Sequence, residues 1–260
     1  MQGDHAIPPT PPEPAPPETV GRAFSRWFGI FASPADVYED WVGAKPNFAN
    51  IFVPTVLAMF AAIVFVLVSF SQPAVLSGVK EAQAKQMEKN AKSQNLTPAQ
   101  IEKQQEITEK FMTTTMLKIF GAVGATFGTI FGLVVESFFA WILLRTLYKT
   151  RIPFPRAVEL TSLSWSVLFI GTFITLSVVV MTGSLYMNVG PSLFVKEFDP
   201  KLKLHQILSV FNVMTIWQLG VESIGIAKIA QRRFLPVALV VYSLWIALRS
   251  LMIFANPMNY

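Results

Sequence analysis

The chain has 260 residues, of which 52% are hydrophobic and 14% charged, and its mean hydropathy is +0.47. Because the apolar residues fall in long blocks, this composition is typical of a multi-spanning membrane protein and excludes an ordinary soluble domain. The net charge of +5 does not indicate nucleic acid binding, since the basic residues lie mainly between the blocks, and the absence of cysteine excludes disulfides and cysteine-ligated metals.

The N-terminal segment, residues 1–18, is rich in proline and includes "PPTPPEPAPP". We expect a disordered, extended tether there. It carries no signal-peptide pattern of a basic stretch, an apolar stretch and a small-residue cleavage site. Anchoring is therefore expected to come from the spans alone.

Residues 19–46 predict two short amphipathic or interfacial helices. In the first, Arg22 and Arg26 are expected to face away from an apolar face. That helix could lie on the membrane surface or pack against the protein. Its apolar residues recur every three or four positions: Val20, Phe24, Trp27, Phe28 and Phe31.

The second short helix is predicted from "SPADVYEDW". Ser33 is expected to be its N-cap, with Pro34 in the first turn and Asp36 completing a capping box. The buried face should consist of four residues: Val37, Tyr38, Trp41 and Val42.

Residues 47–260 should form an all-α, polytopic domain with five transmembrane helices. A bilayer core of about 30 Å needs about 20 helical residues. Five apolar stretches are long enough: 51–72, 117–144, 158–182, 207–229 and 234–254.

Between the first two spans, residues 77–113 are polar and predict a helical hairpin. It is divided at "NLTPAQIEK", where Thr97, Pro98 and Gln100 again form a capping pattern. The hairpin could be a lid or a partner-binding arm, or simply a solvated pair of helices.

The orientation of the protein in the membrane is predicted from the basic residues of its loops. With the N-terminus inside, ten basic residues fall on each side of the membrane, so their number does not decide the orientation. The short loops after the second and fourth spans are almost purely basic, whereas the long loop after the first span mixes five glutamates with its lysines. This favours a cytoplasmic N-terminus.

The second span contains Gly124, Gly128 and Gly132 at intervals of four, on one helix face. Such a stripe lets another helix approach closely, either within the bundle or in a dimer, and we favour the bundle.

Two carboxylates interrupt the apolar spans: Glu136 in the second and Glu222 in the fourth, each in a "VES" triplet with Ser137 or Ser223. Both should lie at similar depth in the cytoplasmic half. Two such groups close together would favour sharing a proton, and transporters and ion pathways use groups of this kind. Alternatively, the protonated side chains hold helices together by hydrogen bonds.

No catalytic set is found. The two histidines are far apart in the sequence, and neither HExxH nor GxSxG occurs. We therefore expect no enzyme activity, cofactor or metal site.

The sequence resembles the Yip family, the Ypt/Rab-interacting membrane proteins with five spans, and in particular its prokaryotic-type branch. The resemblance extends from about residue 33 to the end. It is carried by "FASPADVYEDWVGAKPNF", "NLTPAQIEKQQEITEKF" and "LSVFNVMTIWQLGVESIGIAKIA", in which Phe211, Trp217 and Gly225 fit the family's pattern. We add Gly225 to the helix-packing candidates.

This resemblance implies a non-enzymatic protein of membrane organisation or vesicle traffic. Rab binding is not implied, because the "DLYGP" type signature is absent and Glu222 lies in a span that is mostly apolar in the family. We expect partners in the lipid bilayer and an unknown membrane or cytoplasmic protein, in a multi-pass protein of the inner membrane if the source is prokaryotic. Homo- and hetero-oligomers both stay open, and the rival hypothesis is a small proton- or cation-coupled transporter or channel that uses Glu136 and Glu222.

Overall fold

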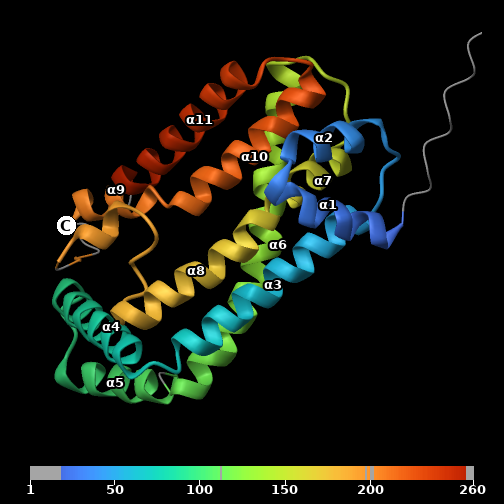
Figure 1. Ribbon diagram of the computed structural model, residues 1–260. Coiled ribbons are helices and arrows are strands. Elements are labelled where there is room, and N and C mark those ends of the chain that lie inside the picture. The colour runs from blue at the N-terminus through green and yellow to red at the C-terminus, as the bar shows by residue number, and fades with distance from the viewer. Residues whose placement is uncertain (1–18, 112, 197, 200–201, 256–260) are drawn as a thin grey trace, which may run out of the picture.

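A computed structural model describes residues 19–111, 113–196, 198–199 and 202–255 (Figure 1). All regular structure within these residues is helical, and the proline-rich segment expected to be a tether lies outside them. The helices are α1 (Val20–Ala32), α2 (Pro34–Gly43), α3 (Ala49–Ser69), α4 (Pro73–Ser93), α5 (Pro98–Phe111), α6 (Thr114–Thr146), α7 (Phe154–Ser164), α8 (Ser166–Thr182), α9 (Lys203–Val210), α10 (Val213–Ala230) and α11 (Phe234–Ala255), with a short 3₁₀ helix η1 (Pro191–Phe194).

The prediction of five membrane spans is confirmed. Within the described residues, five helical segments are long and apolar enough to cross a bilayer, namely α3, α6, α7 with α8, α10 and α11. The third span is interrupted at Trp165, whose backbone N–H donates to Thr161 O at 3.0 Å. The fourth span begins at Val213, later than expected, because Asn212 caps α10 by accepting from the Met214 N–H at 2.9 Å. The preceding residues form α9 instead.

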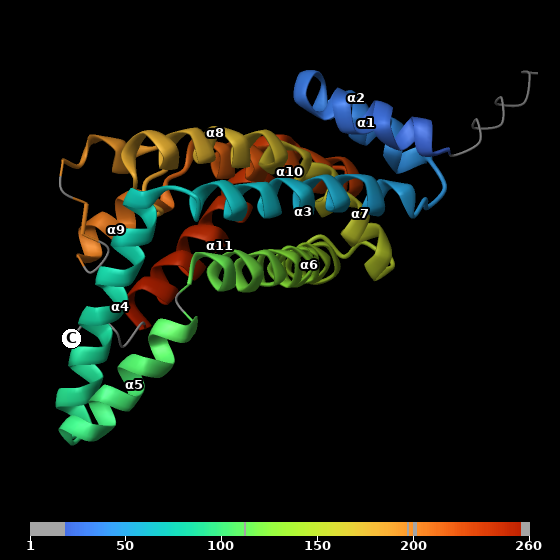
Figure 2. The ribbon, with the colours of Figure 1, turned by 90° about the horizontal axis from the view of Figure 1, so that it is seen from below.

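The spans pack in two layers around α7. Figure 2 shows α3, α8 and α10 in one row and α6 and α11 in the other. Within this arrangement α3 packs against α6, α7 and α8, while α11 packs mainly against α10 and α9. Every residue of α7 from Ala157 to Ser164 is buried, so this short helix forms the centre of the protein.

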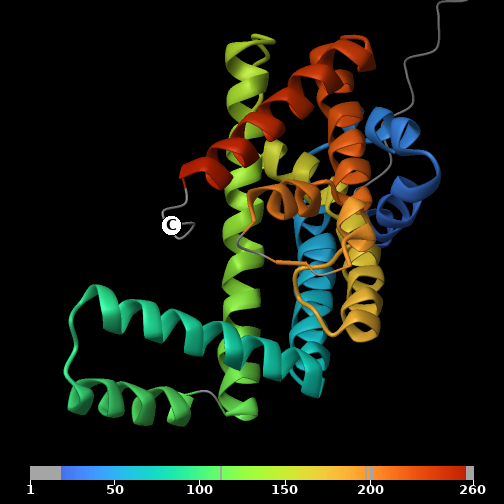
Figure 3. The same ribbon diagram turned by 90° about the vertical axis from the view of Figure 1, so that its left-hand side faces the viewer.

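Helices α1 and α2 lie at the end of the bundle where α7 begins, and the α4–α5 hairpin projects from the opposite end (Figures 1 and 3). The two hairpin helices leave a gap of about 830 Å³ between them, and neither packs extensively against the bundle. The expected capping pattern is formed, since Thr97 N donates to Gln100 Oε1 at 2.9 Å.

The capping box expected at α2 is wrong. Pro34 is in the first turn as predicted, but the Ser33 side chain makes no capping hydrogen bond. Ser33 also ends α1, and its N–H donates to Gly29 O at 2.8 Å, so α2 follows α1 almost without a connection. Of the predicted buried face, Tyr38 and Trp41 are buried, whereas Val42 is exposed.

Candidate functional site: two buried polar clusters joined by α7

The first cluster, called here the intramembrane cluster, consists of Glu136, Thr161, Ser164, Trp165, Gln218 and Glu222. It forms where α6 and α10 meet the break between α7 and α8. Glu136 Oε2 accepts from Trp165 Nε1 at 3.0 Å, and its Oε1 accepts from Gln218 Nε2 at 2.6 Å. Gln218 Nε2 also donates to Ser164 Oγ at 3.0 Å. One glutamate of α6 is therefore tied to both neighbouring spans.

Glu222 completes the intramembrane cluster from α10. Its side chain is 3% exposed, and its Oε1 accepts from Thr161 Oγ1 at 3.0 Å. Glu136 and Gln218 are its polar neighbours in the cluster. Glu136 and Glu222 therefore belong to one buried polar cluster, in which their partners are Trp165, Gln218 and Thr161.

The neighbouring serines are not members of this cluster. Ser223 Oγ donates to Leu219 O of its own helix at 2.7 Å. The hydroxyl of Ser137 is buried without a partner among the described residues.

Two of the four glycine candidates permit close packing in the chain itself. A Cβ at Gly225 would lie 2.7 Å from the Tyr38 ring, and one at Gly132 would lie 3.2 Å from the Trp165 ring. Gly124 and Gly128 lie on the exposed face of α6, where a Cβ would meet nothing within 4 Å. A close contact at these two positions therefore needs a second molecule.

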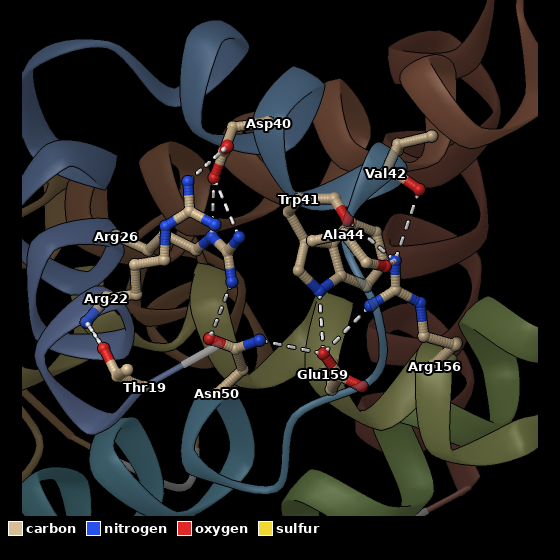
Figure 4. Close-up of polar contacts among 10 residues, drawn as sticks. All are labelled: Thr19, Arg22, Arg26, Asp40, Trp41, Val42, Ala44, Asn50, Arg156 and Glu159. Carbon is tan, nitrogen blue, oxygen red and sulfur yellow. Dashed lines mark hydrogen bonds and ion pairs between the residues drawn. The ribbon is translucent and has the colours of Figure 1, made fainter. Parts of the chain in front are cut away.

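The second cluster, called here the docking cluster, consists of Arg26, Asp40, Trp41, Asn50, Arg156 and Glu159 (Figure 4). Its centre is Glu159 of α7, which is 1% exposed. Glu159 Oε2 accepts from Trp41 Nε1 at 2.8 Å, from Asn50 Nδ2 at 3.0 Å and from Arg156 Nη1 at 3.1 Å. A single carboxylate oxygen therefore connects α2, α3 and α7.

Arg26 links α1 to the same cluster. It is 4% exposed and donates to Asp40 Oδ2 at 2.8 Å and to Asn50 Oδ1 at 3.3 Å. The prediction that Arg26 faces away from the buried side of α1 is wrong, because two polar partners are supplied by α2 and α3. Burying a charged group requires such partners.

Arg156 covers the other side of the docking cluster. Its guanidinium lies 3.9 Å from the centre of the Trp41 ring, a cation–π geometry. It also donates to Trp41 O at 2.7 Å and to Ala44 O at 3.3 Å. These carbonyls lie at the C-terminus of α2, where a cation is electrostatically favoured.

Tyr38 connects the two clusters. Its phenol donates to Leu160 O at 2.9 Å. Burial raises the pKa of the Tyr38 phenol well above its usual value, and the neighbouring carboxyl groups of Glu222 and Glu136 add to this. At the surface, Lys228 Nζ donates to Glu39 Oε2 at 2.6 Å and lowers the pKa of Glu39. Helix α2 is therefore fixed to both α7 and α10.

Helix α1 packs against the bundle with one face and exposes an apolar stripe on the other. Ala23, Trp27 and Ile30 are buried, and the Trp27 ring meets Phe169 of α8 edge-on at 5.3 Å. Phe169 lies near the middle of the α7–α8 span, so α1 reaches into the apolar layer. The exposed stripe is formed by Val20, Phe24 and Phe28, which are 59%, 42% and 65% exposed.

A cleft of about 340 Å³ lies between α3, α6, α8 and α10 on the side of the α4–α5 hairpin. Thr172, Asn212 and Thr215 are among its polar lining residues. Thr215 precedes Gln218 by one helical turn, so the cleft ends near the intramembrane cluster. None of the described residues forms a group of three or more His, Asp or Glu suited to a metal ion.

The sequence singled out Glu136 and Glu222 but missed Glu159 and Arg156, which are equally central. Glu159 lies within the third predicted span, and its position there was the available signal. Charges inside a span are costly and mark structural or functional partners.

This architecture defines a helical membrane protein with five spans and an N-terminal helix pair docked on them. A family model described as "Yip1 domain" matches residues 28–255, so the chain belongs to the Yip family, as its resemblance indicated. The match covers the C-terminal part of α1 and every element after it. No curated protein and no solved structure matches the chain.

Proposed function

We propose that this Yip-family protein is a non-enzymatic scaffold of membrane organisation that acts through protein and lipid contacts at its α1–α2 end. The observation that carries the proposal is the docking cluster, which joins α1, α2, α3 and α7 by buried hydrogen bonds. Because α1 is held in this way, its stripe of Val20, Phe24 and Phe28 is a fixed surface at the edge of the bundle. A fixed, preorganised surface loses less entropy when it binds.

The intramembrane cluster also supports a scaffold function. Glu136 and Glu222 accept hydrogen bonds from Trp165, Gln218 and Thr161, which belong to other helices. Polar side chains bonded across helices hold membrane bundles together. The two carboxyl groups then serve the packing of α6, α7, α8 and α10.

We also propose that the α1–α2 end is cytoplasmic. The ten basic residues that the loop pattern assigns to the cytoplasm lie in α1, at the ends of α6, α7 and α10, and in the connections that meet at this end. We propose further that the protein belongs to the prokaryotic-type branch of the family and lies in the inner membrane.

The scaffold proposal is tested by photocrosslinking in intact membranes. A photoreactive amino acid replaces Phe28 on the stripe, while Arg26 and Ile30 stay in place because both are buried. The matched control carries the same group at Phe127, which is 69% exposed on α6, against 65% for Phe28. We expect a discrete protein adduct from position 28 that position 127 does not give.

Removing the whole of α1 is unsuitable for this test, because Ile30 belongs to the main apolar core. An adduct pattern identical at the two positions, or adducts with lipid alone, would contradict a protein-binding role of the stripe.

A second candidate function is a proton or cation pathway through the intramembrane cluster. The specific observation in its favour is the cleft that ends one turn from Gln218, with Thr172, Asn212 and Thr215 in its lining. Reconstituted vesicles should then show a flux that is lost in Glu136→Gln and in Glu222→Gln. A flux that neither variant changes would exclude this pathway.

A further inference from the structure

The basic residues at the α1–α2 end fall into two groups. One group is paired with acidic residues: Arg22 and Arg26 with Asp40, Arg156 with Glu159, and Lys228 with the exposed Glu39. The other group is exposed and forms no ion pair with any described residue. It includes Lys45, which follows α2, and five residues called here the basic platform: Arg145, Lys149, Arg151, Arg232 and Arg233.

The basic platform is formed by two connections, one between α6 and α7 and one between α10 and α11. Figure 1 shows both connections at the same end of the bundle. Tyr148 and Ile152 of the first connection, and Ile229 and Ala230 before the second, pack against the same apolar core. Burial raises the pKa of the Tyr148 phenol, and the nearby charge of Arg232 opposes that rise. The two connections are therefore neighbours.

Both connections are structured turns. Lys149 and Gln231 have positive φ angles of 54° and 51°, a left-handed conformation that is uncommon for residues other than glycine. Thr150 donates from its N–H and its Oγ1 to Leu144 O, at 3.0 and 2.8 Å. On the other side the N–H of Arg232 donates to Ala227 O at 3.0 Å. The cations are thus held on fixed backbone.

An aromatic residue indicates the depth of the platform. Trp141 Nε1 donates to Ile152 O at 3.2 Å, and the Trp141 ring lies 4.9 Å from the guanidinium carbon of Arg145. Tryptophan side chains gather at the level of the lipid head groups. Because the platform begins next to Trp141, we expect its five positive charges to lie at the level of the lipid head groups.

We propose that the basic platform is one binding site for the phosphate of an anionic phospholipid in the leaflet at the α1–α2 end. The inference rests on the proposed scaffold function and names the lipid class that it engages. Basic loops also orient a membrane protein, but orientation does not require two loops to converge on structured turns. Arginine and lysine without internal acid partners are suited to phosphate.

The test uses the purified full chain in mild detergent. Binding of phosphatidylglycerol, phosphatidylcholine and inorganic phosphate is measured separately by native mass spectrometry. We expect phosphatidylglycerol to bind in preference to phosphatidylcholine, with an affinity that falls as salt is added. The variant Arg232→Gln/Arg233→Gln should bind phosphatidylglycerol roughly tenfold or more weakly, because each basic residue near the surface contributes to attraction of anionic lipid.

The matched control is Lys85→Gln/Lys89→Gln, which removes two charges from α4 at the opposite end of the bundle and should bind like the parent. Equal losses in both variants, or no loss in either, would overturn the proposal. Inorganic phosphate that binds as tightly as the lipid would overturn the lipid assignment in favour of a free-phosphate site. The protein adduct from position 28 reports on the scaffold function separately, so failure of the lipid site and failure of that function are distinguishable.

Discussion

Substitution of Glu159 tests the docking cluster most severely. In Glu159→Ala three buried donors lose their shared acceptor, those of Trp41, Asn50 and Arg156. Breaking a buried ion pair by removing one partner costs about 3–5 kcal/mol, and the lower end applies here because Arg156 keeps its bonds to Trp41 O and Ala44 O. Each neutral donor left unsatisfied adds about 1 kcal/mol or more, unless water reaches it. We therefore expect a loss of at least about 3 kcal/mol.

The assay is thermal unfolding of the purified chain in mild detergent, combined with limited proteolysis. For a chain of this size about 1 kcal/mol corresponds to about 2–4 °C, so the melting temperature should fall by roughly 6 °C or more. Proteolysis should cleave first around α1 and α2, because Glu159 holds Trp41 of α2. A nick elsewhere would point to general unfolding.

The matched control is Glu39→Gln, which also removes a glutamate that pairs with a basic residue. Glu39 is exposed, and exposed pairs contribute little to stability. If Glu159→Ala melts within about 2 °C of Glu39→Gln, the docking cluster does not hold α1 and α2, and the reasoning fails.

Three further predictions follow from neighbouring contacts. In Gly225→Ala the new methyl group would lie 2.7 Å from the Tyr38 ring, so α2 should shift and be cleaved faster in limited proteolysis. The control is Gly124→Ala, where a Cβ meets nothing within 4 Å, and it should behave like the parent. In Tyr38→Phe the lost bond to Leu160 O should cost about 1 kcal/mol at neutral pH. The pKa of Tyr38 is raised in the folded state, so its neutral phenol stabilises the fold fully below about pH 10 and less above it. The melting temperatures of the parent and of Tyr38→Phe should therefore converge at alkaline pH. A difference that stays constant with pH would contradict this. Replacement of residues 77–111 by a short flexible linker should leave the melting temperature of the bundle nearly unchanged, since α4 and α5 hardly contact it, whereas a large fall would show that the hairpin supports the spans.

The spans could be predicted from the sequence because each is a long apolar run, and run length is a local property. The same holds for Pro34 in the first turn of α2 and for the capping pattern at Thr97. The Ser33 box failed because Ser33 also ends α1, and its backbone angles, φ −141° and ψ 64°, depart from the extended conformation that is usual at an N-cap. The local capping pattern does not show that the preceding helix, α1, ends at the same residue.

The docking cluster could not be predicted in this way. Arg26, Asn50 and Glu159 are far apart in the sequence and become neighbours only when α1, α3 and α7 pack together. Amphipathic periodicity assigns arginine to the polar face, so the pattern predicted that Arg26 faces outward. Glu136 and Glu222 were recognised because they stand in apolar runs, but the bond from Gln218 to Glu136 depends on the packing of α6 against α10.

The measurement that tests the central claim most directly is the melting temperature, in mild detergent, of Glu136→Leu and Glu222→Leu beside the parent. If the two carboxyl groups hold α6, α7, α8 and α10 together, leucine leaves Trp165, Gln218 and Thr161 without their acceptors, and both variants should melt below the parent. Leucine variants that melt above the parent would contradict the structural role, because the chain would then retain destabilising polar groups for another purpose, such as an ion pathway.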